Sequence, residues 1–246
     1  MSEHDEHLIV RTAANPTYRW GNFLLITAPP ARRGDPERWI DRFRRAFPRA
    51  RHVAIGLDAP APDARTCERF VAAGLSGEEN AVLVCETPRE RVRAPAHTDF
   101  RALRDDDDWA RATNLRASVD ETSASGYREF LERQMRAVRA ACERGHGAWF
   151  GAFRDGEMLA GLGVFDAGDA LARFQAVDTH PAHRRQGLAS TLLVRAGEHA
   201  RTQLRARQLV IAADPHYFAI DIYRALGFRE RERQLQFERV HPQPGA

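Results

Sequence analysis

Short apolar runs alternate with amphipathic stretches along the first third of the chain. Apolar runs of strand length predict strands, and apolar residues at helical spacing predict helices. Asp35 and Pro36 are residue types that begin a helix. The expected elements are a strand at 20–27, a helix at 35–47, a strand at 52–58, a helix at 63–75 and a strand at 81–86. This alternation indicates an α/β protein.

A polar, proline-bearing stretch without an apolar period follows at 87–98. We therefore place a domain boundary near residues 93–97 and expect domains at 1–95 and 96–246. The second part predicts a short strand and a helix within 99–119, a helix at 127–145, a hairpin at 148–166, a strand at 172–179, a helix at 186–205, a strand at 208–214, a helix at 217–228 and a strand at 234–240.

Two local signals refine this pattern. Asp155 and Gly156 form the turn signal of the hairpin. Four consecutive aspartates at 105–108 stand in the first turn of the helix within 99–119. The helix dipole favours negative charge at that end, so we expect these aspartates to cap the helix and to face solvent.

The two parts of the chain resemble each other. The strand at 52–58 is similar to the strand at 208–214, and residues 69–75 are similar to residues 222–228. In that alignment Gly74 matches Gly227, and Phe70 stands where Tyr223 does. We interpret this as a divergent internal duplication, with a chance likeness of two α/β segments as the alternative.

Composition excludes several classes of protein. All 37 basic residues are arginine, and a net charge of +3 with 34 interspersed acidic residues provides no basic stripe for nucleic acid. Three distant cysteines form neither a disulfide framework nor a zinc motif, which predicts a reducing, cytoplasmic location. The apolar run near residue 25 is too short and too proline-rich for a membrane span. The acidic and histidine-bearing start at 4–7 is expected to be a solvated tail, with no metal-binding role.

The start of the helix at 186–205 has the features of an anion site. The first turn of a helix leaves backbone N–H groups unpaired and carries partial positive charge. Gly187 and Ala189 keep side chains away from those donors, and Arg184 adds positive charge. Pro181 restricts the chain as it leaves the preceding strand. The natural ligand of this helix start is a phosphate or pyrophosphate.

Arg184-x-x-Gly187-x-Ala189, between a strand and a long helix, resembles the pyrophosphate motif of the GNAT superfamily of acyl-CoA-dependent N-acyltransferases. The resemblance covers roughly residues 98–240. It implies a mixed central sheet with flanking helices, in which two parallel strands splay apart around the pantetheine of acetyl-CoA. It also implies main-chain contacts from Val177, Asp178 and Thr179, and a pyrophosphate loop formed by Arg184, Arg185, Gln186, Gly187, Leu188, Ala189 and Ser190.

The resemblance also implies a general acid. Tyr223, four residues before Gly227, matches the tyrosine that protonates the departing thiolate in similar enzymes, and a packed aromatic residue is the alternative reading. Many family members have asparagine seven residues earlier, where this chain has His216. We keep His216 among the cofactor-binding residues, with a role as base or a simple place at the helix entrance as alternatives.

The general base is not evident. The family glutamate in the strand before the motif would fall near Arg173 and Phe174, where no glutamate stands. Asp178 fits either a solvated strand end or a role towards the acceptor. The candidate bases are Asp178, Asp214, His216, His146 and the pair Asp120 and Glu121, which would equally serve to cap a polar loop.

The expected function is an N-acetyltransferase that passes the acetyl group of acetyl-CoA to a small-molecule or peptide amine by direct attack, without metal. A non-catalytic acyl-CoA-binding or regulatory module is the alternative. The region 1–95 lacks the motif, because its loop at 29–39 has proline at the helix start and Phe70 replaces the tyrosine. We expect it to be a partial GNAT-like repeat without cofactor, used for packing, for substrate shaping or for a homodimer contact.

Overall fold

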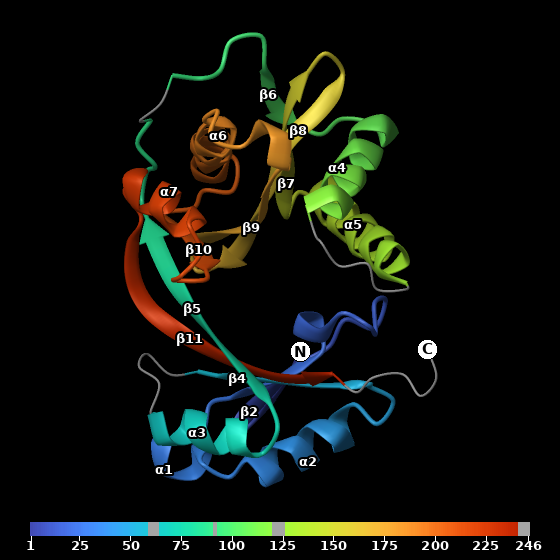
Figure 1. Ribbon diagram of the computed structural model, residues 1–246, viewed down its shortest axis with the longest axis vertical. Helices are drawn as coiled ribbons and strands as arrows, with labels where there is room; N and C mark the ends of the chain where they lie inside the picture. Colours follow the sequence, from blue (N-terminus) through green and yellow to red (C-terminus); the bar gives the residue numbers. More distant parts are fainter. Residues whose placement is uncertain (59–63, 91–92, 120–125, 241–246) are drawn as a thin grey trace. The chain divides into compact units, whose positions relative to one another are not determined.

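The computed structural model, shown in Figure 1, describes residues 1–58, 64–90, 93–119 and 126–240. The chain divides into two units, one of Met1–Val82 with Glu232–Ala246 and one of Leu83–Arg231. Among the described residues, no helix is long and apolar enough to cross a membrane.

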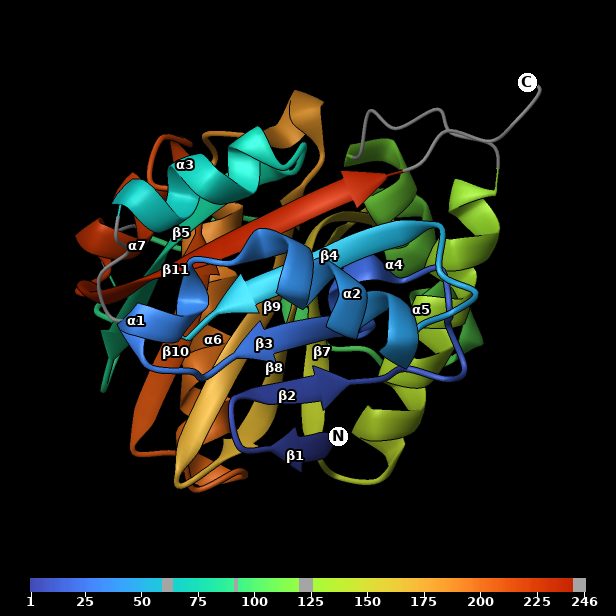
Figure 2. The ribbon, with the colours of Figure 1, turned by 90° about the horizontal axis from the view of Figure 1, so that it is seen from below.

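The first unit is a sheet with helices on one face (Figure 2). Its strands follow the order β1 (Ser2–His4), β2 (His7–Val10), β3 (Phe23–Ile26), β4 (His52–Leu57), the C-terminal part of β11 (Arg229–Val240) and the start of β5 (Ser76–Cys85). From β1 to β11, neighbouring strands are antiparallel except β3 and β4, which are parallel. The remaining elements of this unit are the 3-10 turn η1 (Arg19–Gly21) and the helices α1 (Pro30–Arg33), α2 (Pro36–Ala46) and α3 (Ala64–Ala72).

Helix α2 begins where the sequence predicts. The Asp35 carboxylate accepts a hydrogen bond from the Arg38 N–H at 3.2 Å, and Pro36 occupies the first helical position. Trp39, Ile40 and Phe43 of α2 are fully buried against alternate residues of β3 and β4. Burial of these side chains is what attaches α2 to the sheet.

The N-terminal segment is not the solvated tail that the sequence predicts. Residues of β1 and β2 form a hairpin, and His7 is only 9% exposed. Glu6, at the hairpin turn, forms ion pairs with Arg32 at 3.2 Å, with Arg42 at 3.1 Å and with Arg38. The prediction was wrong because these partners come from helices more than twenty residues away in sequence.

The second unit is a six-stranded sheet between two groups of helices. Its order is the end of β5 (Ser76–Cys85), then β10 (Gln208–Ala213), β9 (Leu171–Thr179), β8 (Glu157–Gly168), β7 (Gly147–Arg154) and β6 (Asp99–Ala102). Strands β6 to β9 pair antiparallel, and β9 and β10 pair parallel. Its helices are α4 (Asp106–Val119), α5 (Tyr127–Glu143), the 3-10 turn η2 (Pro181–His183), α6 (Leu188–Thr202) and α7 (Ala219–Ala225).

Alternation along β7 explains how this sheet is covered on both faces. Trp149 packs in a cluster with Leu115 of α4 and Leu131 of α5, whereas the next residue, Phe150, meets the His199 ring of α6 at 5.4 Å. Helices α4 and α5 therefore cover one face and α6 covers the other (Figure 1). The hairpin turn is also as predicted, because Asp155 and Gly156 both have positive φ, at 52° and 82°.

Two strands are longer than the apolar pattern indicates, and each belongs to both units. β5 begins in the first unit and ends in the second, and β11 does the reverse. In the first unit β4 pairs with β11, from Leu57 with Leu235 to His52 with Val240. In the second unit β10 neighbours β5. The first unit therefore contains β11 from Glu232 on, and the second unit contains β5 from Leu83 on.

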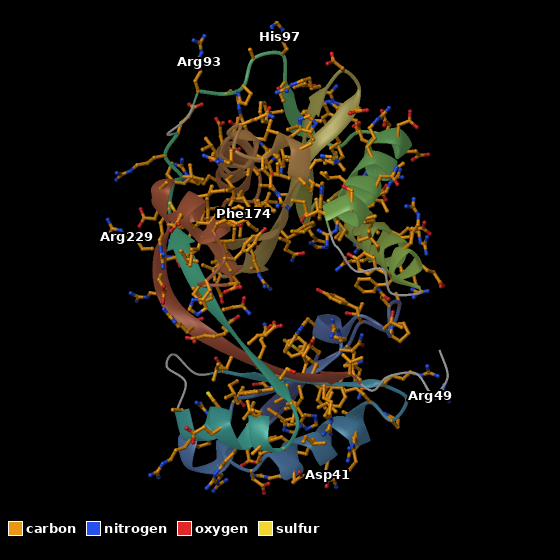
Figure 3. All side chains as sticks on the ribbon, viewed as in Figure 1. Asp41, Arg49, Arg93, His97, Phe174 and Arg229 are labelled. Carbon is orange, nitrogen blue, oxygen red and sulfur yellow. The ribbon has the colours of Figure 1, made fainter. Side chains whose placement is uncertain are left out.

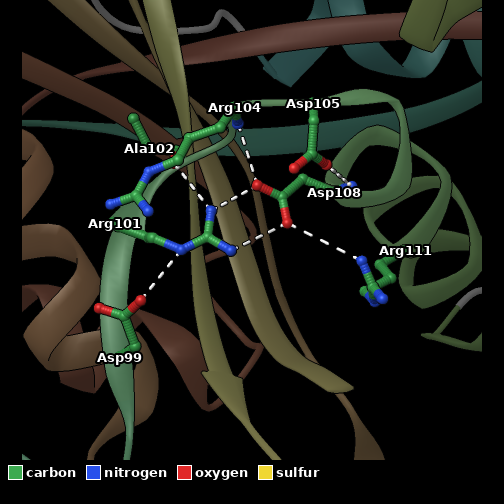
Figure 4. A network of polar contacts seen from close by, with 7 residues as sticks. All are labelled: Asp99, Arg101, Ala102, Arg104, Asp105, Asp108 and Arg111. Atoms are coloured by element: carbon green, nitrogen blue, oxygen red, sulfur yellow. Dashed lines mark hydrogen bonds and ion pairs between the residues drawn. The ribbon is translucent and has the colours of Figure 1, made fainter. Parts of the chain in front are cut away.

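The aspartates at the start of α4 differ from the expected solvated face. The Asp105 carboxylate caps the helix by accepting from the Asp108 N–H at 2.9 Å, as predicted. Asp108, however, is only 1% exposed and accepts hydrogen bonds from the Arg101 guanidinium through both of its oxygens (Figure 4). The Arg101 hydrogen bonds lower the pKa of Asp108 although burial opposes this. Asp108 is therefore a buried ion-pair partner.

Candidate functional site

The parallel strands β9 and β10 separate part-way along their length. Their pairing covers Leu171 to Arg173 on β9 and Gln208 to Val210 on β10. β9 then continues to Thr179 and β10 to Ala213, with no further pairing between them in this described segment. Main-chain groups of β9 beyond Arg173 are thus left without a partner from β10. The splayed parallel strands predicted from the sequence are present.

A β-bulge lies on β9 in the separated part. Gln175 pairs with Gly163 and Asp178 with Gly161, so that Ala176 and Val177 stand opposite Leu162 alone. Ala176 has a φ of 50°, in the left-handed region that non-glycine residues rarely adopt. A bulge bends the strand and increases its twist. It therefore bends β9 at the three candidate residues Val177 to Thr179.

The N-terminus of α6 presents unpaired backbone donors. The N-cap is Gly187, with a φ of 80° and no side-chain cap hydrogen bond. The first bond of the helix runs from the Thr191 N–H to the Gly187 carbonyl at 3.0 Å. The N–H groups of Leu188, Ala189 and Ser190 therefore have no acceptor within the helix. These donors fit an anion such as a pyrophosphate.

The loop before α6 is connected to its surroundings by two arginines. Arg184 directs its Nε to the Thr179 carbonyl at 3.4 Å, which joins the loop to the end of β9. Its guanidinium also lies 6.0 Å from the centre of the exposed Phe218 ring. Arg154, at the β7–β8 turn, donates to Gln186 Oε1 at 3.3 Å. Arg185 is exposed, and its φ of 64° turns the chain into the helix.

The phenol of Tyr223, on α7, has a raised pKa. Its side chain is 5% exposed and packs edge-on against Phe228, with ring centres 6.3 Å apart. Burial, together with the negative charge of Asp178, raises the pKa of Tyr223 to about 12. The phenol is therefore protonated at neutral pH, and α7 and β9 bring Tyr223 and Asp178 into one electrostatic environment.

The sequence of this region matches the family model described as "Acetyltransferase (GNAT) family" over residues 110–228. Residues 110–228 belong to the GNAT acetyltransferase family. They include the divergent strands, the start of α6 and Tyr223, so that all site residues predicted from the sequence fall in this GNAT domain. Family and fold together support acyl transfer as the general chemistry. A search among curated proteins gave no match.

Solved structures share the fold of this chain over most of its length. A conserved protein of unknown function from Staphylococcus epidermidis is 12% identical, with a TM-score of 0.79, over 98% of this chain and 94% of that one. A GCN5-related N-acetyltransferase from Kribbella flavida is 17% identical, with a TM-score of 0.64, over 96% and 90%. A tandem GNAT protein of clavulanic acid biosynthesis, solved without acetyl-CoA, is 16% identical, with a TM-score of 0.58, over 91% and 76%. At such identities these likenesses concern the fold.

The candidate bases of this GNAT domain are placed very differently. His216 is exposed in the loop before α7, and its backbone N–H donates to the Asp214 carboxylate at 2.8 Å. Asp178 forms an ion pair with Arg116 of α4 at 2.8 Å. His146 lies at the other end of the sheet, because its carbonyl accepts from Asp166, whereas Asp178 pairs with Gly161 five residues earlier on β8. Asp120 and Glu121 lie outside the described residues.

The position of the missing family glutamate is occupied by side chains without a carboxylate. Arg173 is exposed, and Phe174 is 3% exposed, with its ring 6.0 Å from that of Phe228 (Figure 3). The described residues contain no group of three or more histidine, cysteine or acidic side chains able to hold a metal ion.

Sequence reasoning missed two residues beside Asp178. Arg116 is one arginine among many, and Trp149 stands in an apolar strand where core packing is the natural reading. In the structure the Arg116 guanidinium lies 5.6 Å from the centre of the Trp149 indole and also binds Asp178. No local signal marks either residue, because their partners are distant in sequence.

Proposed function

We propose that the GNAT domain transfers the acetyl group of acetyl-CoA directly to an amine, without a covalent enzyme intermediate. The observation that carries this proposal is the buried, protonated Tyr223 next to strands that separate and lead into an uncapped helix. Such an arrangement combines a place for an extended thioester with an anion site and a proton donor. In the non-catalytic alternative, Tyr223 would serve only as a packed aromatic residue.

The donor would be held mainly by backbone. Val177, Asp178 and Thr179 would offer main-chain groups of the separated β9 to the pantetheine amides. The loop from Arg184 to Ser190 would enclose the pyrophosphate, using the free N–H groups at the start of α6 and the charge of Arg184. His216 would line the outer edge of this site, since its side chain is exposed before α7.

The residues of this chain supply one clear proton-transfer step. When the amine nitrogen bonds to the acyl carbon and the C–S bond breaks, the sulfur gains the electron pair of that bond. Tyr223 then donates its phenolic proton to the thiolate and regains a proton from solvent. The amine nitrogen loses its extra proton to water or to a carboxylate. Among the candidate carboxylates, Asp178 is the one whose charge affects the pKa of Tyr223.

One observation favours the alternative of a non-catalytic acyl-CoA-binding module. The family glutamate position is filled by Phe174, and the nearby Asp178 is already paired with Arg116. A binding module would retain acetyl-CoA affinity and show no turnover with any amine. Turnover therefore separates the two functions.

We further propose that the region 1–95 is a degenerate GNAT-like half without a donor site. β3 and β4 stay paired from Leu24 with Ile55 to Ile26 with Leu57, and the Asp58 N–H still donates to the Ile26 carbonyl at 2.9 Å. Arg33 then donates to the carbonyls that follow both strands, at Ala28 and, at 2.9 Å, at Asp58. The space that separated strands would offer a ligand is absent from this described part of the unit.

Steady-state release of free thiol from acetyl-CoA, with a panel of amines, tests the proposal. Tyr223→Phe should lower kcat by about 10²–10³-fold with little change in the KM for acetyl-CoA, because only the proton donor is lost. Tyr18→Phe, which removes a hydroxyl from the first unit, is the matched control and should keep full activity. Unchanged kcat in Tyr223→Phe would refute the role of Tyr223.

A further inference from the structure

Two buried N–H groups beside the proposed reaction centre have no hydrogen-bond acceptor. They are Trp149 Nε1 and Arg116 Nε, within the part of the chain that the structure describes. Trp149 is only 3% exposed. Buried donors are nearly always paired in folded proteins, and an unpaired one calls for an explanation, such as a ligand that completes it.

Glycines of β8 set the position of the indole. A Cβ at Gly163 would lie 2.8 Å from Trp149 Cε3, and a Cβ at Gly161 would lie 3.3 Å from Trp149 Nε1. The indole therefore lies across both glycines, with its N–H over Gly161. Gly161 is the cross-strand partner of Asp178. The Trp149 N–H is thus held on the side of the sheet that bears Asp178.

Arg116 completes this cluster from α4. Its guanidinium lies 5.6 Å from the indole centre, and its Nη1 donates to Asp178 Oδ2 at 2.8 Å. That ion pair fixes the guanidinium between Trp149 and Asp178 and leaves Nε unpaired. Burial and then the charge of Asp178 raise the pKa of Tyr223, the proposed general acid.

The chemistry of the two unpaired groups specifies their ligand. Both are donors, neither can accept, and Arg116 is positively charged, so the complementary group is one that only accepts and carries negative charge. A carboxylate meets these requirements and forms charge-assisted bonds with arginine. Given the proposed acetyl transfer, we propose that the acceptor is an amino acid whose carboxylate binds Arg116 Nε and Trp149 Nε1, with its amine directed to Asp178 and Tyr223.

The first test compares acceptors on the intact protein. Thiol release from acetyl-CoA is measured with a panel of free amino acids, with the corresponding amino-acid amides and with the decarboxylated amines. The inference predicts that kcat/KM for at least one amino acid exceeds that of its amide and of its decarboxylated amine by tenfold or more. A short peptide ending in the same residue distinguishes a free amino acid from a peptide C-terminus as the source of the carboxylate.

The second test removes each donor while keeping its surroundings. Trp149→Phe retains a ring without an N–H, and Arg116→Lys retains the charge without Nε. Each should raise the KM for the amino acid at least tenfold and reduce the preference over the amide, with acetyl-CoA affinity by calorimetry unchanged. Trp109→Phe, in the same apolar cluster, is the control and should leave that KM unchanged. If Trp149→Phe does not fold, the Arg116→Lys variant and the comparison of acceptors still test the carboxylate site.

The outcomes separate this inference from the proposed function. Equal use of amino acids, amides and decarboxylated amines overturns the carboxylate site and leaves acetyl transfer standing. Bound acetyl-CoA without turnover for any amine overturns the proposed function and this inference with it. If both variants keep the tenfold preference for acceptors with a carboxylate, then Arg116 and Trp149 do not bind that carboxylate.

Discussion

Packing changes the acidity of Tyr223 in a direction that suits its proposed role as proton donor. A solvated tyrosine has a pKa near 10, whereas burial and the charge of Asp178 raise the pKa of Tyr223 to about 12. The raised value keeps the phenol protonated, and therefore able to donate, to a higher pH. The same environment prevents its use as a base at neutral pH.

This shift predicts the alkaline side of the pH–rate profile. The kcat of acetyl transfer should show no loss from tyrosine ionisation up to about pH 10.5, because Tyr223 is still protonated there. The profile is measured from pH 7 to 11, with correction for spontaneous thioester hydrolysis. A fall in kcat with a midpoint near pH 10 would show an ordinary tyrosine pKa and contradict this account.

Asp108 illustrates a residue whose role depends on a distant partner. Replacing it with asparagine removes a buried negative charge and leaves Arg101 without its main partner. Asp108→Asn should lower the free energy of unfolding by about 3 kcal/mol in urea denaturation. Because folding lowers the pKa of Asp108, its stabilising effect is present above the ordinary aspartate pKa and is lost as the pH falls below it.

The matched control for this variant is Asp106→Asn. Asp106 is also in the first turn of α4 and pairs with Arg139 at 2.7 Å, but its side chain is 88% exposed. An exposed pair contributes about 0–1 kcal/mol, so this change should have little effect. Equal losses in the two variants would mean that burial of Asp108 does not matter.

At the level of elements, Gly187 at the start of α6 has a structural role as N-cap and a proposed role in donor binding. Gly187 has a φ of 80°, and Gly168, the last residue of β8, has the same φ with open space around it. Alanine at either position should cost about 1–2 kcal/mol of stability, because a Cβ disfavours the left-handed region.

Only one of these two variants should weaken donor binding. In Gly187→Ala the added methyl group stands beside the free N–H groups of α6, and the Kd for acetyl-CoA should rise tenfold or more. Gly168→Ala should bind acetyl-CoA as the parent protein does. Calorimetric titration after urea denaturation of both variants checks the pair, and an equal Kd for the two would remove Gly187 from the binding site.

Elements with local signals were predicted well from the sequence. The Asp155–Gly156 turn, the Asp35 cap of α2 and the glycine start of α6 are each set by residues next to one another. The β1–β2 hairpin and the exchange of β5 and β11 were not predicted, since both depend on pairing between distant segments. Arg116 and Trp149 were not predicted as site residues for the same reason.

At the level of the whole molecule, the two halves share a βαβα pattern but differ at the place where a donor would bind. β9 and β10 separate after three paired residues, whereas β3 and β4 remain paired and Arg33 joins the carbonyls beyond them. The difference is consistent with the proposal that only the second half has a donor site. The proposed division into 1–95 and 96–246 differs from the two folded units, because β5 and β11 each belong to both units.

The most direct test of this account is calorimetric titration of acetyl-CoA into the intact protein and into an Arg184→Ala/Gly187→Ala double variant. The account predicts one binding site per chain in the intact protein and loss of that site in the double variant, with its fold retained by circular dichroism. Two sites per chain would contradict the closed state of the N-terminal half. No binding to the intact protein would contradict the acetyltransferase function itself.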